Sequence, residues 1–216
     1  MEELDEAEEH KKASIIVISD FVCPWCYIGL SEIERLARDF DLDVHFAPFL
    51  LRPETPSEGM LSRHITPLNA PPTPTEIRAG PLGIQFSRGR TWVPNSHLAL
   101  EAAEFAGEYG DQWRFHRDMF KAYFDDLKDI GKIETIVEIG AGAGLPEAAL
   151  GEALTERRYR ARVDEGIAWS RAIGVTAVPT FVIDERTGIV GAQELDTFKK
   201  VLGDLGHKPR SEAVAL

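Results

Sequence analysis

Near both ends the chain carries short apolar runs, and longer repeats of apolar residues fill its middle. The first run, residues 14–19, is β-branched and bounded by polar residues, which predicts a strand buried on both faces. Residues 43–49 alternate well enough to predict a second strand. Between them an amphipathic helix is expected, because apolar side chains recur at helical spacing, at Ile28, Leu30, Ile33, Leu36, Ala37 and Phe40. The N-terminal part therefore predicts a strand–helix–strand unit.

The middle of the chain has a different pattern. Residues 50–90 are rich in proline and glycine, and we expect little regular structure in their centre. From Pro94 onward helical patterns dominate, and apolar residues on more than one side of residues 111–127 predict a helix packed on both sides. The helices expected here are residues 95–110, residues 111–127, one that ends at the glycines of residues 140–144, one that starts near Pro146, and residues 157–172.

The last part of the chain returns to strand patterns. Residues 179–184 and 187–192 predict the two arms of a hairpin, and residues 194–205 predict a short amphipathic helix. The order is βαβ, a helical block, then ββα, which is best explained by an α/β fold whose single sheet is built from both ends of the chain. The division we predict is an acidic N-terminal tail (1–12), a discontinuous sheet domain (13–49 and 174–210) and an inserted helical domain (50–173).

Composition narrows the classes of partner. The chain has 216 residues and a formal net charge of -12, so a phosphate backbone would be repelled and nucleic acid is not expected as a partner. Apolar runs are too short to span a bilayer, and the first residues are acidic where a secretory signal would be basic and then apolar. We expect a cytoplasmic protein without membrane contact.

Both cysteines of the chain lie in one motif, Cys23-Pro24-Trp25-Cys26, between the first predicted strand and its helix. Two cysteines three residues apart across a helix start can bond reversibly without moving the backbone. Cys23 would lie at the unpaired N–H groups of the helix start, which favour its thiolate, whereas Cys26 would be more buried and protonated. This asymmetry predicts that Cys23 attacks a substrate disulfide and that Cys26 releases the product.

Metal binding is the main chemical alternative for this motif. A structural zinc site needs four ligands, and no second cysteine pair or pair of histidines at ligand spacing accompanies Cys23 and Cys26. The histidines are scattered along the chain, at positions 10, 45, 64, 97, 116 and 207. We therefore expect no metal site.

Two further features bear on the motif. Pro179 precedes an apolar strand, where it marks either an ordinary strand edge or a special turn. If the Val178–Pro179 bond is cis, the turn can face the cysteine motif, and backbone groups of Val178 can pair with an extended substrate. Asp20 is interpreted first as an aspartate that caps the loop, and alternatively as a proton acceptor or donor for Cys26.

Taken together, these segments resemble the DsbA family of the thioredoxin superfamily, and within it the FrnE-like branch. The motifs are "SDFVCPWCYIGL", "PNSHLAL", "FKAYFDDLKDIG", "GVTAVPTFVI" and "GAQ", which occur in the family's order. The resemblance implies a thioredoxin-like fold with a large helical insertion, a nucleophile at Cys23, a resolving thiol at Cys26 and a cis proline at Pro179. Related glutathione-dependent chromene-carboxylate isomerases typically have serine at the nucleophile position and no second cysteine.

Trp25, which lies between the two cysteines, affects the expected redox potential of the Cys23–Cys26 pair. Periplasmic DsbA-type oxidants resemble this site but have a histidine in place of Trp25, which helps to stabilise their thiolate. We expect the pKa of Cys23 to lie below that of a free thiol but to be less depressed than in those oxidants, with a less oxidising potential. Trp25 either contacts unfolded clients or packs locally. Asn95 and His97 resemble a segment near the glutathione site of the isomerases and are interpreted here as structural.

The function predicted from the sequence is that of a thiol:disulfide oxidoreductase or isomerase acting on protein or small-molecule disulfides. No bound cofactor is expected, and glutathione is a candidate redox partner or cosubstrate. Two alternatives stay open. One is a glutathione-dependent isomerase or transferase that uses a single thiol, and the other is a redox-independent chaperone or interaction module.

Overall fold

The computed structural model describes residues 12–63 and 65–210. Of the predicted acidic tail (1–12), all but Lys12 lies outside the described residues, as do His10 and His64. No helix in the described part of the chain is both long and apolar enough to cross a membrane.

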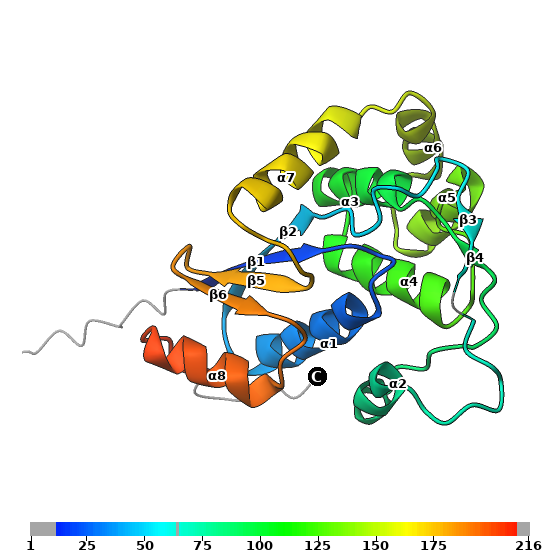
Figure 1. Cartoon of the computed structure of the whole chain (residues 1–216). Coiled ribbons are helices and arrows are strands. Elements are labelled where there is room, and N and C mark those ends of the chain that lie inside the picture. Colours follow the sequence, from blue (N-terminus) through cyan, green and yellow to red (C-terminus); the bar gives the residue numbers. More distant parts are fainter. Residues whose placement is uncertain (1–11, 64, 211–216) are drawn as a thin grey trace, which may run out of the picture.

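A four-stranded sheet forms the centre of the fold, in the order β2-β1-β5-β6 (Figure 1). Strand β1 pairs parallel to β2 and antiparallel to β5, and β5 pairs antiparallel to β6. The strands come from both ends of the chain, as the sequence predicts: β1 (Ala13–Ser19), β2 (Leu42–Pro48), β5 (Thr180–Ile183) and β6 (Thr187–Val190).

Two helices cover one face of this sheet and the insertion lies toward the other (Figure 1). Helix α1 (Pro24–Asp39) connects β1 to β2, and α8 (Leu195–Asp204) follows β6. Ile15 and Val17 of β1 pack with buried residues of α1 and α8, whereas Ile18 of the same strand packs on the opposite face with Phe49 and Val175. The alternation of β1 therefore supplies two cores, as a strand buried on both faces requires.

Five helices form most of the insertion between β2 and β5. They are α3 (His97–Tyr109), α4 (Gln112–Phe124), α5 (Ile133–Gly142), α6 (Glu147–Thr155) and α7 (Arg160–Ala172). Side chains of α4 lie in one apolar core with residues at the start of α1. The helical block is thus fastened directly to the element that carries the cysteine motif, while its description as a separate domain (50–173) stays a prediction.

The segment between β2 and α3 contains more structure than the sequence predicts. It holds the two-residue strands β3 (Met60–Leu61) and β4 (Trp92–Val93), which pair with each other, helix α2 (Pro74–Ala79) and a 3-10 turn (Gly80–Leu82). Helix α2 forms inside a proline-rich stretch because Pro74 occupies its first turn and Thr73 and Glu76 form a reciprocal capping box. The expectation of little regular structure was wrong at this point.

His116 on α4 is buried among aromatic side chains. Its ring stacks on Phe46 at 3.8 Å between ring centroids and lies 4.9 Å from the ring of Phe21. Neither ring nitrogen finds a hydrogen-bond partner among the described residues. Burial alone lowers the pKa of His116 to about 3. The folded protein therefore keeps this imidazole neutral throughout the physiological range.

This burial predicts a pH dependence of stability. Below about pH 6.5 the unfolded chain binds a proton that the folded chain excludes, so the free energy of unfolding falls by about 1.4 kcal/mol per pH unit toward pH 3. His116→Phe removes this contribution, and we expect a correspondingly flatter dependence in denaturant titrations between about pH 6 and pH 4. The matched control is His45→Phe, since the side chain of His45 is 62% exposed. Equal slopes in wild type and His116→Phe would contradict the prediction.

Candidate active site

The cysteine motif forms the first turn of helix α1. Cys23 is the N-cap residue with extended backbone angles (φ -96, ψ 113), and Pro24 follows in the first turn, where its missing N–H costs nothing. Both cysteines are free thiols and both are buried, with 3% of Cys23 and 1% of Cys26 exposed. Cys26 therefore lies behind Cys23, one turn into the helix.

Hydrogen bonding distinguishes the two thiols. The Cys26 thiol donates a hydrogen bond to the Cys23 sulfur, and this bond is the largest cause that lowers the pKa of Cys23. Hydrogen bonds from the backbone N–H groups of Cys26 and Trp25 also lower it. Burial and the charge of Asp20 oppose this shift, but the net direction is downward. The pKa of Cys26 is raised, first by burial and then by its interactions with Cys23. The thiolate form is thus more favoured at Cys23 than at Cys26, the asymmetry that the sequence predicts.

A proline turn from the far end of the chain faces this pair. The Val178–Pro179 peptide bond is cis, as expected, and the Val178 carbonyl oxygen lies 3.5 Å from the Cys23 sulfur. The Pro179 carbonyl accepts from the Gly191 N–H, whereas the Val178 N–H makes no hydrogen bond with any residue that the structure describes. One backbone donor beside Cys23 is therefore available to a substrate.

Gly29 allows the proline turn to approach helix α1, a role that the sequence analysis missed. A Cβ atom at Gly29 would lie 2.9 Å from the ring of Phe181 and 3.0 Å from the ring of Pro179. A glycine in the interior of a predicted helix, one turn after Cys26, is the signal that could have identified this close approach.

Asp20 is completely buried beneath the motif. Its carboxylate accepts hydrogen bonds from the backbone N–H groups of Val22 (3.3 Å) and Leu51 (2.7 Å), which confirms the interpretation as a loop cap. Burial raises its pKa, while the Ser96 side chain and those two N–H groups act to lower it. The carboxylate is also close enough for its charge to raise the pKa of Cys26. The proton-transfer role of Asp20 stays a prediction.

The remaining predicted residues lie in different surroundings. Trp25 is 37% exposed at the start of α1. Asn95 donates to the Thr55 carbonyl and accepts from the His97 N–H, and the His97 ring bridges Glu101 and Asp164. Asn95 and His97 thus make structural contacts that connect α3 with its neighbours.

The described residues contain no cluster of three or more histidine, cysteine or acidic side chains suited to a metal ion.

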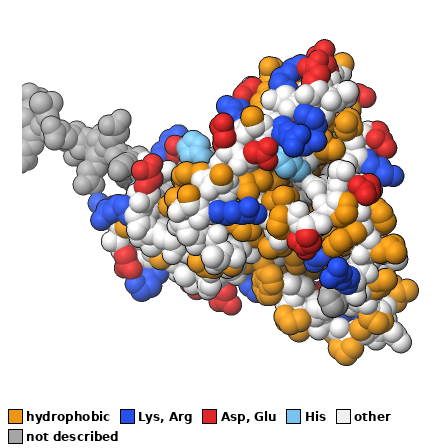
Figure 2. All heavy atoms as spheres, turned by 45° about the horizontal axis from the view of Figure 1, so that its top comes forward, with side chains coloured by type: hydrophobic (Ala, Val, Ile, Leu, Met, Phe, Trp, Pro, Cys, Tyr) orange, Lys and Arg blue, Asp and Glu red, His pale blue; other side chains and the backbone are white. Residues whose placement is uncertain are grey.

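Hydrophobic side chains are exposed along the segment after β2, and Figure 2 shows such side chains gathered at the lower right of the molecule. The most exposed of them are Leu61, Ile65, Leu68 and Ile77.

Comparison with known proteins places this site in context. The model of the DSBA-like thioredoxin domain matches residues 14–203. The uncharacterized protein YwbO of Bacillus subtilis (strain 168) is 32% identical over 199 residues, which cover 88% of this chain and 96% of YwbO.

Solved structures agree with the fold. A probable DsbA oxidoreductase from Streptomyces coelicolor superposes with a TM-score of 0.75 at 20% identity, covering 94% of this chain and 93% of the other. The cytosolic disulfide reductase DsbM from Pseudomonas aeruginosa, solved with GSH, superposes with a TM-score of 0.64 at 19% identity over 89% of this chain and 98% of the other.

Proposed function

Because this chain belongs to the DSBA-like thioredoxin domain family, we propose that it is a thiol:disulfide oxidoreductase or isomerase with Cys23 as nucleophile and Cys26 as resolving thiol. The observation that carries the proposal is the placement of two free thiols in the first turn of α1, with the cis Val178–Pro179 turn beside Cys23. The pKa values of the two thiols are shifted in opposite directions. Only the thiolate attacks a disulfide, so one sulfur is ready to react while the other is held in reserve.

The reaction has two exchange steps. The Cys23 thiolate attacks one sulfur of a substrate disulfide, the substrate S–S bond breaks, and one substrate thiolate leaves. Cys26 then loses its proton and attacks the Cys23 sulfur, which forms the Cys23–Cys26 disulfide and releases the second substrate thiolate. The substrate gains two electrons and the protein loses two. In the reverse direction the protein disulfide oxidises a dithiol by the same steps.

Three features support a role for the surroundings of Cys23 in substrate binding. The Val178 N–H can pair with the backbone of an extended substrate beside the Cys23 sulfur. Trp25 offers a partly exposed apolar surface, and the nearby insertion exposes further hydrophobic side chains. Unfolded polypeptides are therefore part of the proposed substrate range, along with small-molecule disulfides.

The cytoplasm is the proposed compartment and glutathione a proposed redox partner. Support comes from the likeness to the P. aeruginosa protein, whose name describes a cytosolic disulfide reductase and which was solved with GSH. A chain with two cysteines in one motif is also what a reducing compartment favours, since structural disulfides are rare there.

The proposal is tested by the redox potential of the Cys23–Cys26 pair in glutathione buffers. We expect one two-electron transition, with a midpoint more negative than the value of about −120 mV that is typical of DsbA, because Trp25 supplies no positive charge to stabilise the thiolate. Trp25→His is the matched variant and should move the midpoint in the oxidising direction. Cysteines that form no disulfide across the buffer range would contradict the proposal.

A further inference from the structure

A small cavity of about 250 Å³ opens beside the cysteine motif. Its lining includes Val22 and Pro24, the two residues that flank Cys23, and continues over the segment between β2 and α3 and onto α4. Pockets for drug-sized ligands typically measure about 300–1,000 Å³. This cavity is therefore suited to one short arm of a small molecule rather than to a polypeptide chain.

Charge in the lining is positive, although the chain carries a formal net charge of -12. Three arginines, Arg52, Arg88 and Arg90, face a single carboxylate, that of Glu76. Whether the cavity can bind an anion depends on how many of these guanidinium groups are already paired.

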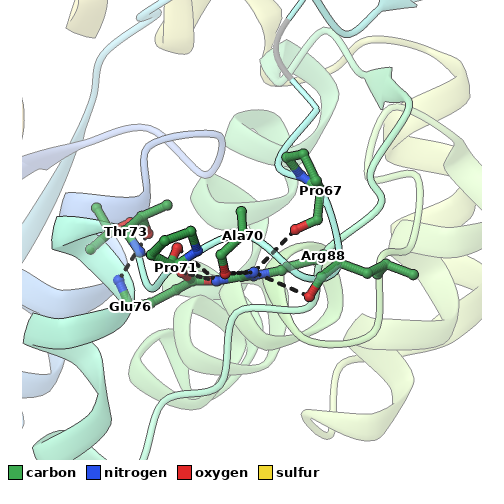
Figure 3. A network of polar contacts seen from close by, with 8 residues as sticks. Pro67, Ala70, Pro71, Thr73, Glu76 and Arg88 are labelled. Atoms are coloured by element: carbon green, nitrogen blue, oxygen red, sulfur yellow. Dashed lines mark hydrogen bonds and ion pairs between the residues drawn. The ribbon is translucent and has the colours of Figure 1, made fainter.

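Arg88 is occupied by contacts that hold the wall of the cavity together (Figure 3). Its Nε lies 2.7 Å from Glu76 Oε1, and Nη2 lies 2.8 Å from Glu76 Oε2. The other donors reach backbone carbonyls at positions 67, 68, 70 and 71. This network fastens the preceding loop to the start of α2, and it leaves no guanidinium donor of Arg88 directed at a ligand.

Arg90 is also occupied. Its guanidinium carbon lies 3.6 Å from the centroid of the Tyr123 ring, and Nη2 donates to the Tyr123 carbonyl. Arg90 therefore acts as a packing contact between the insertion and α4.

Arg52 differs from both. It is half-buried, and within the described part of the chain its guanidinium makes no hydrogen bond or ion pair. Burial raises the pKa of the Asp20 carboxylate beneath the motif, and the charge of Arg52 partly opposes that shift. A cation held partly out of water gains most from a partner that brings both charge and hydrogen-bond acceptors, as a carboxylate does.

We propose that this cavity binds the carboxylate-bearing arm of a low-molecular-weight disulfide, with Arg52 as the ion-pair partner, while the sulfur of the same arm meets Cys23. The inference rests on the proposed function and names a substrate class for it. The exchange is the one described above, in which the Cys23 thiolate bonds to the bound arm and the second arm leaves as a thiolate.

The experiment compares three probe disulfides with different end groups: dithiodipropionate (carboxylates), hydroxyethyl disulfide (neutral) and cystamine (ammonium groups). Each rate constant for the reduced protein is divided by that of dithiothreitol with the same disulfide, which removes differences in intrinsic reactivity. We expect wild type to prefer the dicarboxylate over the neutral probe despite its net negative charge. Arg52→Gln should reduce the ratio of the dicarboxylate rate to the neutral rate by about tenfold.

Two further variants sharpen the result. Arg52→Lys keeps the charge and should retain part of the preference, whereas Arg186→Gln removes an exposed charge from the β5–β6 turn and should change nothing. The neutral probe reports whether each variant retains a working Cys23. Reaction with all three probes without preference for carboxylates, or a preference that survives in Arg52→Gln, would overturn this inference alone. Rates no faster than dithiothreitol with every probe would overturn the proposed function itself.

Discussion

Cys26→Ser is expected to accumulate a covalent complex between Cys23 and its substrate, whereas Cys23→Ser should lower the exchange rate roughly 10³-fold or more. Cys23 carries the stabilised thiolate, and a serine hydroxyl stays protonated under the same conditions. Without Cys26 the second step has no internal nucleophile, so the mixed disulfide persists until an external thiol arrives. Non-reducing gel electrophoresis and mass spectrometry of the purified variants measure both outcomes.

Cys26→Ala is the matched variant that separates the two roles of Cys26. Serine keeps a donor near the Cys23 sulfur, but alanine removes the hydrogen bond that contributes most to the lowered pKa of Cys23. We therefore expect the alanine variant to form the mixed disulfide more slowly at neutral pH than the serine variant. Equal rates would mean that the Cys26 donor does not control Cys23.

The same variants discriminate between the functional alternatives. A glutathione-dependent isomerase or transferase needs one activated thiol, so its turnover would survive Cys26→Ser. A redox-independent chaperone would suppress client aggregation even when both cysteines are replaced. Loss of turnover in Cys26→Ser together with trapped substrate is expected only for disulfide exchange.

The arrangement of the site could be predicted from sequence because it depends on short-range pattern. The spacing of Cys23 and Cys26 across a helix start and the position of Pro179 before an apolar strand are local features, and the structure brings them to within 3.5 Å, from the Cys23 sulfur to the Val178 carbonyl. That one sheet takes its strands from both ends of the chain follows from the apolar runs there. Each of these signals is contained in a few consecutive residues.

What could not be predicted depends on long-range contacts. The carboxylate of Glu32, on α1, is buried and pairs with Arg78 of α2, 46 residues away, an interaction without a signal in either segment. Nothing in the sequence indicates that His116 stacks on Phe46 of β2 and is buried with no hydrogen-bond partner among the described residues. Arg52 likewise stands apart from the other two arginines of the cavity only in the structure, where Arg88 pairs with Glu76 and Arg90 packs on Tyr123.

Asp20→Asn is expected to slow the second exchange step by about 10²-fold near neutral pH, the lower end of what general base catalysis contributes. Cys26 must lose a proton before it can attack, and its pKa is raised by burial. Asp20 is buried beside it with a pKa that burial also raises, which brings the carboxylate nearer to the pH range where it can accept that proton. Asparagine has nearly the same shape but cannot act as a base.

The two steps can be observed in one trace with dithiobis-nitrobenzoate, whose coloured thiolate is released once by Cys23 and once by Cys26. In Asp20→Asn the first phase should be unchanged or slightly faster, because the Asp20 charge that raises the pKa of Cys23 is gone. The second phase should be slow and should approach the wild-type rate at high pH, where hydroxide removes the Cys26 proton instead. Ser96→Ala keeps the carboxylate but removes a contact that lowers the pKa of Asp20, so its second phase should require a higher pH than wild type. If Asp20 were only a loop cap, Asp20→Asn would lower the free energy of unfolding and leave the ratio of the two phases unchanged.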